Sequence, residues 1–177
     1  MQMLSRTVDS FRIALEVPAD YQIYFISSAT EAWEIVAQSL IAEKSLHLYN
    51  GAFGEKWKEY TQRIHASSIG VEYGINEVPV LPSNQTDYDV LCLTHCETSN
   101  GTELPNNVMR SLRSQFNGLI AVDATSSMAG VSLSWLNADI WFASVQKCVG
   151  MPPGLGVIIV SPQALEVASS LNDHRYY

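Results

Sequence analysis

The sequence has few basic residues. Lys and Arg together number 10, against 18 Asp and Glu among 177 residues, so the formal net charge is −8. A protein that binds a run of phosphates, in nucleic acid or on an anionic membrane, needs clustered cationic side chains to neutralise them. The composition therefore argues against a nucleic-acid or membrane partner, while one small anion can still bind at a local site.

Cysteines and long apolar runs are also scarce. Cys92, Cys96 and Cys148 follow no pairing pattern, which predicts reduced thiols in a cytoplasmic protein. The first residues contain no apolar stretch of signal-peptide length, and the apolar run at 157–160 is far too short to cross a bilayer. By contrast, hydrophobic residues make up 47% of the chain, enough to bury a core and to exclude a disordered protein.

Short apolar, β-branched runs recur along the whole chain. Most lack a polar residue at alternate positions, which is typical of parallel strands covered by helices on both faces. They predict seven strands, at 22–26, 46–49, 69–73, 90–94, 119–123, 140–144 and 156–160.

Helical patterns lie between these runs. In residues 30–42 the apolar positions follow the i, i+3, i+4, i+7, i+8 spacing of an amphipathic helix. Further helices are predicted at 53–65, at 105–116 and from about residue 162. Alternating strands and helices indicate an α/β fold with a mostly parallel sheet, in which ligands bind at the carboxyl ends of the strands.

Two strand-to-helix loops have features of a ligand site. Ser28 and Glu31 have capping-box spacing, and the free N–H groups at such a helix start suit a phosphate. Phe53 lies between Gly51 and Gly54 and could stack on a planar ligand. Each loop also has a simpler interpretation, an ordinary helix cap for Ser28 and a core anchor for Phe53.

Two further loops carry polar clusters at strand ends. Residues 94–101 read Thr-His-Cys-Glu-Thr-Ser-Asn-Gly. Cys92, His95 and Cys96 lack a second ligand pair at zinc spacing, so no metal is expected, and a Cys96–His95 nucleophile is disfavoured because sequence neighbours rarely form such a pair. Asp123 ends a buried apolar strand, where a carboxylate needs a cation or several donors. It is interpreted either as a site residue or as a loop cap.

The most informative position is Lys147. The other lysines, Lys44, Lys56 and Lys58, lie where a solvated charge is expected. Lys147 lies in an apolar stretch followed by a Pro-Pro pair, which predicts a desolvated amine with a lowered pKa, suited to Schiff-base chemistry. A buried structural ion pair is the alternative.

Together, the five loops fit one cofactor. A planar, phosphorylated aldehyde with a basic ring nitrogen would use the helix start after Ser28 for its phosphate, Phe53 for stacking and Thr98 for its ring oxygen. Asp123 would pair with the ring nitrogen, and Lys147 would bind the aldehyde. That cofactor is pyridoxal 5′-phosphate.

The same loops resemble those of the class V aminotransferases. The resemblance is carried by the Ser-Val-Gln-Lys-Cys-Val-Gly-Met-Pro-Pro-Gly-Leu segment at 144–155 and by four other segments in the family's order. These are Ser-Ser-Ala-Thr at 27–30, Asn-Gly-Ala-Phe-Gly at 50–54, Glu-Thr-Ser-Asn-Gly at 97–101 and Asp-Ala-Thr-Ser-Ser at 123–127.

The resemblance implies the fold and the site residues. The fold would be that of the large domain of aspartate-aminotransferase-like enzymes, a seven-stranded, mostly parallel sheet whose strand after Lys147 is antiparallel. Lys147 and Asp123 would be catalytic, Thr98 and Phe53 would contact the cofactor ring, and the phosphate site would be lined by Ser28, Ala29, Thr30 and Gln146. Residues 1–177 would form an incomplete large domain, without the N-terminal arm and the small C-terminal domain of relatives.

The resemblance also implies a homodimer and an amino-group transfer between an amino acid and a 2-oxo acid. The expected pair is glutamate with 3-phosphohydroxypyruvate. Three alternatives stay open. One is an alanine–glyoxylate or serine–pyruvate exchange, another is a lyase or desulfurase reaction on the same cofactor, and the third is a truncated module without catalysis.

Overall fold

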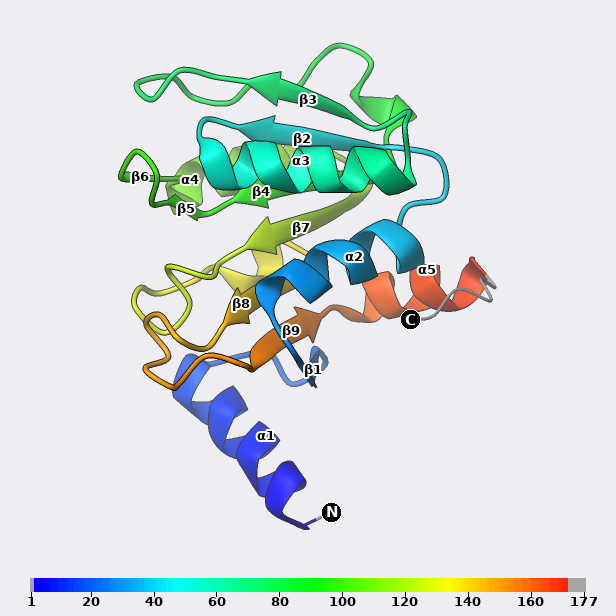
Figure 1. The fold of residues 1–177 in the computed structure, drawn as a ribbon. Helices are drawn as coiled ribbons and strands as arrows, with labels where there is room; N and C mark the ends of the chain where they lie inside the picture. Colours follow the sequence, from blue (N-terminus) through cyan, green and yellow to red (C-terminus); the bar gives the residue numbers. More distant parts are fainter. Residues whose placement is uncertain (1, 172–177) are drawn as a thin grey trace.

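The computed structural model describes residues 2–171, so residue 1 and residues 172–177 of the expected domain lie outside the described residues. A seven-stranded sheet forms the centre of the molecule, in the order β1-β9-β8-β7-β4-β2-β3 (Figure 1). Its strands are β1 (Gln22–Ile26), β2 (Ser45–Tyr49), β3 (Ile69–Glu72), β4 (Val90–Thr94), β7 (Leu119–Asp123), β8 (Ile140–Ser144) and β9 (Gly156–Val160).

Strand direction follows the expected pattern. β3, β2, β4, β7 and β8 pair in parallel, whereas β9 runs antiparallel to both of its neighbours, β8 and β1. The mostly parallel α/β fold is therefore confirmed. Strand limits differ from prediction by one residue at two places, since β2 begins at Ser45 and β3 ends at Glu72.

Helices cover both faces of the sheet because the central strands are apolar on both sides. Every residue of β7, β8 and β9 is buried. On one face the core includes residues of α2 (Ala29–Ser39), α3 (Ala52–Ile64) and α5 (Pro162–Ser170), which lie together in front of the sheet in Figure 1. On the other face the core includes residues of α4 (Asn106–Gln115) and the 3-10 turn η2 (Trp135–Asn137), with α1 (Gln2–Leu15) packed at its margin.

The predicted helices are present with small differences at their ends. The helix expected at 30–42 ends at Ser39, and Leu40 and Ile41 continue into the core as irregular chain. The short pieces β5 (Cys96–Glu97), β6 (Thr102–Glu103) and η1 (Gln85–Asp87) complete the described elements. β5 and β6 pair as a small hairpin beyond the end of β4, and this hairpin carries the Glu97–Gly101 loop toward the site.

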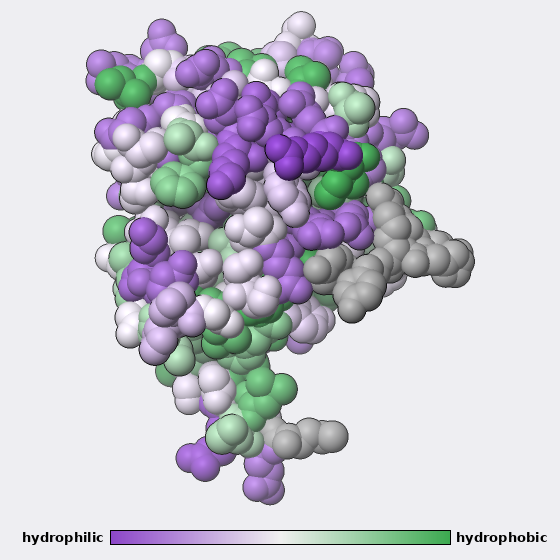
Figure 2. All heavy atoms as spheres, viewed as in Figure 1, coloured by the Kyte–Doolittle hydropathy of each residue, from purple (hydrophilic) through white to green (hydrophobic). Residues whose placement is uncertain are grey.

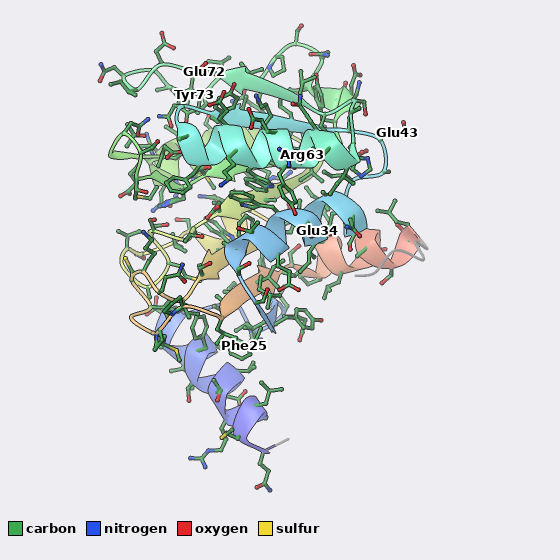
Figure 3. All side chains as sticks on the ribbon, in the orientation of Figure 1. Phe25, Glu34, Glu43, Arg63, Glu72 and Tyr73 are labelled. Carbon is green, nitrogen blue, oxygen red and sulfur yellow. The ribbon has the colours of Figure 1, made fainter. Side chains whose placement is uncertain are left out.

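The helix α1 was not predicted. No residue in it is buried, and only Val8, Phe11 and Leu15 pack against the core. Phe11 meets Phe25 of β1 edge-on, with ring centroids 6.4 Å apart, and Figure 3 shows Phe25 between β1 and α1. Elsewhere α1 extends away from the body of the molecule (Figure 1).

The surface is mixed in character. Figure 2 shows mostly hydrophilic residues over α3, and hydrophobic ones gathered lower down, where α1 meets the body. Within residues 2–171, no helix combines the length and apolarity needed to cross a membrane.

Candidate active site

A cavity of about 220 Å³ lies at the carboxyl edge of the parallel strands. Thr94, Asp123 and Ser144 contribute to it from the last positions of β4, β7 and β8. The register pairs Thr94 with Asp123, so neighbouring strand ends present their side chains to the same space. The remaining lining residues are Ala29, Thr30, Trp33, Phe53, Lys56, Cys96, Thr125, Ser126, Gln146 and Lys147.

Asp123 lies at the base of the cavity and is only 6% exposed. One carboxylate oxygen accepts the indole N–H of Trp33 at 3.1 Å, and the other accepts the backbone N–H of Thr125 at 2.9 Å. Burial raises the pKa of Asp123, the contacts with Thr125 and Trp33 oppose that rise, and the charge of Glu97 adds to it. Trp33 was predicted only as part of an apolar stripe, so its donor role was missed.

Lys147 lies in the connection between β8 and β9 and lines the same cavity as Asp123, as the shared sheet edge predicts. The prediction of a desolvated amine was wrong, because Lys147 is exposed. The buried apolar segment ends at Val145, and the chain then turns outward, leaving Pro152 and Pro153 exposed as well. The apolar residues that precede Lys147 in the sequence are buried in β8, and their burial does not extend to the loop that carries Lys147.

The start of α2 forms one wall of the cavity. Ser28 caps the helix, with its hydroxyl accepting the backbone N–H of Glu31 at 3.1 Å, so the predicted cap is confirmed. The N–H of Ala29 donates to the hydroxyl of Ser144 at 2.8 Å, which joins this helix start to the end of β8. Ala29 and Thr30 line the cavity, whereas Ser28 does not.

The start of α3 forms the opposite wall, where Phe53 lines the cavity and is 47% exposed. Glu97, only 1% exposed, holds this helix start, because its carboxylate accepts the N–H groups of Phe53 and Gly54, both at 3.1 Å. The same carboxylate accepts both the N–H and the hydroxyl of Ser99. A Cβ at Gly51 would lie 2.5 Å from the Glu97 side chain, so this approach needs glycine.

Thr98 and Gln146 have different outcomes. Thr98 is exposed and lies outside the cavity lining, while its neighbour Glu97 points inward to α3. Gln146 is exposed but lines the cavity beside Lys147. Of the eight residues predicted for the cofactor, the structure thus brings six to the cavity wall, namely Ala29, Thr30, Phe53, Asp123, Gln146 and Lys147.

The chain is similar to known proteins in sequence and in fold. The family described as Aminotransferase class-V matches residues 1–173. The chain belongs to the class-V aminotransferase family. A phosphoserine aminotransferase from Rhodococcus opacus (strain B4) is 34% identical over 160 residues, which is 89% of this chain and 42% of that protein.

Solved structures of aminotransferases have the same fold. A phosphoserine aminotransferase from Cytophaga hutchinsonii superimposes with a TM-score of 0.89 at 32% identity, over 97% of this chain and 48% of that one. Pyridoxamine-pyruvate aminotransferase from Mesorhizobium loti gives a TM-score of 0.79 at 26% identity, over 96% of this chain and 46% of that one. The chain therefore spans less than half the length of each of these three relatives.

Lys56, Cys96 and Ser144 also line the cavity, although the sequence analysis assigned none of them a role in the site. Burial and neighbouring negative groups raise the pKa of Cys96, which opposes thiolate formation. Within residues 2–171, no group of three or more His, Cys, Asp and Glu side chains is arranged to hold a metal ion.

Proposed function

We propose that this chain is the cofactor-binding part of a pyridoxal-phosphate-dependent aminotransferase whose substrates are glutamate and 3-phosphohydroxypyruvate. Membership of the class-V aminotransferase family supports the reaction type. The names of its relatives support the substrate pair, because phosphoserine aminotransferases from Rhodococcus opacus and Corynebacterium glutamicum are 34% and 32% identical to it.

The observation that carries the proposal is the buried carboxylate of Asp123. It faces the cavity and forms no ion pair with any residue in the described range 2–171. A buried carboxylate without a cation is costly, which is why its pKa is raised. A protonated ring nitrogen would supply the missing positive charge, so the residues present fit pyridoxal phosphate.

Each residue then has a distinct task. When bound, pyridoxal phosphate supplies an aldehyde and an electron-accepting ring. Asp123, fixed by hydrogen bonds from Trp33 and Thr125, would hold the proton on the ring nitrogen. The amine of Lys147 would hold the cofactor through its aldehyde carbon, with the aldehyde oxygen leaving as water. Once an amino-acid substrate has displaced it, the same amine would take the proton from the substrate Cα. Its exposure leaves it free to reach both positions.

The walls of the cavity position the cofactor. Phe53 would cover the ring, and the first turn of α2 at Ala29 and Thr30 would receive the phosphate, with Gln146 on the same cavity wall as Lys147. Ser28 acts by capping that turn. For Thr98, contact with the ring oxygen stays a prediction, and it requires the β5–β6 loop to move inward from its present exposed position.

Covalent capture tests the site. The chain is titrated with pyridoxal phosphate, reduced with borohydride and mapped by peptide mass spectrometry. We expect a visible absorption band and a single label on Lys147. Lys147→Ala should lose both. Lys44→Ala, whose lysine lies 3.9 Å from Asp87 and outside the cavity, should lose neither. A label on another lysine in the wild-type chain would contradict the proposal.

Substrate assays separate the alternatives. Glutamate with 3-phosphohydroxypyruvate should react, and alanine with glyoxylate should not. Release of sulfide from cysteine would instead indicate a desulfurase. Cofactor capture without any turnover would favour a non-catalytic module.

We also propose a homodimer in the cytoplasm. Exposed apolar side chains on α1, including Met3 and Ile13 at 82% and 77% exposure, support an association surface. The free thiols of Cys92, Cys96 and Cys148 support a reducing compartment. Sedimentation at micromolar concentration should give a dimer, and a stable monomer would contradict this assembly.

A further inference from the structure

Lys56 lies on the wall of the cavity, although its sequence position suggested only a solvated charge. It comes from the first turns of α3, three positions after Phe53, and both side chains line the same space. Residues three apart on a helix share a face, so the face that presents the aromatic ring to the cavity also presents this amine.

Contacts between α2 and α3 locate Lys56 more closely. Tyr60, one turn further along α3, packs on Trp33 of α2, with ring centroids 6.3 Å apart. Trp57 stacks on the same Trp33 at 6.2 Å. Ala29 lies one turn before Trp33, just as Lys56 lies one turn before Tyr60. Lys56 therefore lies at the same end of the α2–α3 pair as Ala29 and Thr30, and all three line the cavity.

The charges in the cavity leave Lys56 without a partner. Asp123, Lys147 and Lys56 are the charged residues among those lining it. Asp123 and Lys147 have tasks at the ring nitrogen and the aldehyde in the proposed function. No ion pair joins Lys56 to another residue in the described part of the chain. Its neighbour Lys58 differs, because its amine lies over the Tyr49 ring, 5.2 Å from the centroid.

A phosphate monoester needs more positive charge than one helix start provides. It carries between one and two negative charges near neutral pH, whereas the helix dipole contributes the equivalent of about half a positive charge. The N–H of Ala29 is already bonded to Ser144, and that of Glu31 to Ser28, which leaves few backbone donors in this turn. A side-chain cation close to the turn would complete the site.

We propose that Lys56 binds the cofactor phosphate, together with the first turn of α2. This inference rests on the proposed function, since it needs the phosphorylated aldehyde in the cavity. It gives Lys56 a selective task, because an amine that pairs with the phosphate favours pyridoxal phosphate over pyridoxal and contributes nothing to the binding of the unphosphorylated aldehyde.

The test compares two aldehydes and two variants. Dissociation constants for pyridoxal phosphate and for pyridoxal are measured by absorbance titration of the wild-type chain, Lys56→Gln and Lys58→Gln. For Lys56→Gln, the dissociation constant of pyridoxal phosphate should rise about fivefold, a modest factor because the amine is partly solvated. That of pyridoxal should not change. Lys58→Gln, on the same helix but outside the cavity lining, should match the wild type for both aldehydes.

Two results would overturn this inference while leaving the proposed function intact. One is an affinity for pyridoxal phosphate that does not change in Lys56→Gln. This result overturns the inference even if the affinity for 3-phosphohydroxypyruvate falls. The other is an equal loss of affinity for both aldehydes. A wild-type chain that binds neither aldehyde would instead overturn the proposed function itself. Raising the salt concentration should shrink the difference between wild type and Lys56→Gln, as screening requires.

Discussion

The helices α2 and α3 both begin at the edge of the cavity, yet their first turns are satisfied in different ways. At α3 the chain supplies its own anion, because Glu97 accepts the N–H groups of Phe53 and Gly54, and Ser99 accepts that of Ala52. At α2 the hydroxyls of Ser28 and Ser144 accept the first N–H groups of the helix, and the Glu31 carboxylate of this turn accepts the N–H of Ser27, just before the helix.

This difference assigns a separate role to each helix start. A helix start filled by an internal carboxylate is rigid and closed to external anions. One capped by hydroxyls keeps its favourable potential for a ligand. The site thus pairs a fixed wall that carries Phe53 with a wall able to receive a charged group. Each of the following changes disturbs one side of this contrast.

The largest effect is expected at Glu97. Glu97→Ala removes the acceptor for four donors, three N–H groups and the Ser99 hydroxyl, inside a buried site. The free energy of unfolding should fall by about 3 kcal/mol, since the buried N–H of Gly54 and the part-buried N–H groups of Phe53 and Ser99 all lose their acceptor. Urea denaturation measures the loss. Glu55→Ala, which removes an exposed carboxylate from the same helix, serves as the control. An equally small change in both variants would contradict the stabilising role of Glu97 at the start of α3.

Acid should lower the free energy of unfolding through His47, which is buried beneath α3. His47 is buried there against Trp57, with ring centroids 5.3 Å apart, and burial lowers its pKa from 6.5 to about 3, with Lys58 adding to the effect. The unfolded chain binds a proton below pH 6.5 and the folded chain does not. Stability therefore falls as pH decreases, by about 2 kcal/mol between pH 6.5 and 5 from this group.

Replacing His47 tests that assignment. In His47→Gln the dependence of stability on pH over this interval should flatten. Burial also lowers the pKa of His95, so the part of the pH dependence that His95 causes should remain. A slope identical to that of the wild type would show that His47 already titrates normally in the folded chain.

The smallest effect is expected at the start of α2. Ser28→Ala removes the cap of that helix and should lower the free energy of unfolding by about 1 kcal/mol, the usual cost of losing such a cap. The exposed Ser114→Ala on α4 should change it by less than about 0.5 kcal/mol. A loss at Ser28 as large as that at Glu97 would remove the contrast between the two helix starts.

Sequence patterning was most successful where a local rule decides the structure. Apolar runs defined the strands because the central strands are buried on both faces. Parallel strand ends meet at one edge, which brought Asp123 and Lys147 to one cavity. The capping spacing of Ser28 and Glu31 likewise depends only on neighbours along the chain.

Features that depend on distant contacts were not predicted. The exposure of Lys147 follows from the path of the β8–β9 connection, which hydropathy does not describe. In the Glu97–Gly101 loop, the choice between Glu97 and Thr98 as the inward residue depends on the hairpin β5–β6 and on the position of α3. The hydrogen bond from Trp33 to Asp123 joins α2 to a strand far along the chain. The apolar pattern of α2 predicts that Trp33 faces the core, but it does not predict this partner.

The pairing of β1 with β9 has a consequence for how the molecule assembles. The register joins Gln22 to Val160, so the first strand of the sheet meets its partner only after all the strands between them are available. Such distant pairings close slowly because the loop entropy is lost before the contacts form. The wall formed by α2 follows directly from β1 and is tied to Ser144 at the end of β8. We therefore expect the α2 wall of the cavity to become ordered late in folding, after the Asp123 end of the sheet.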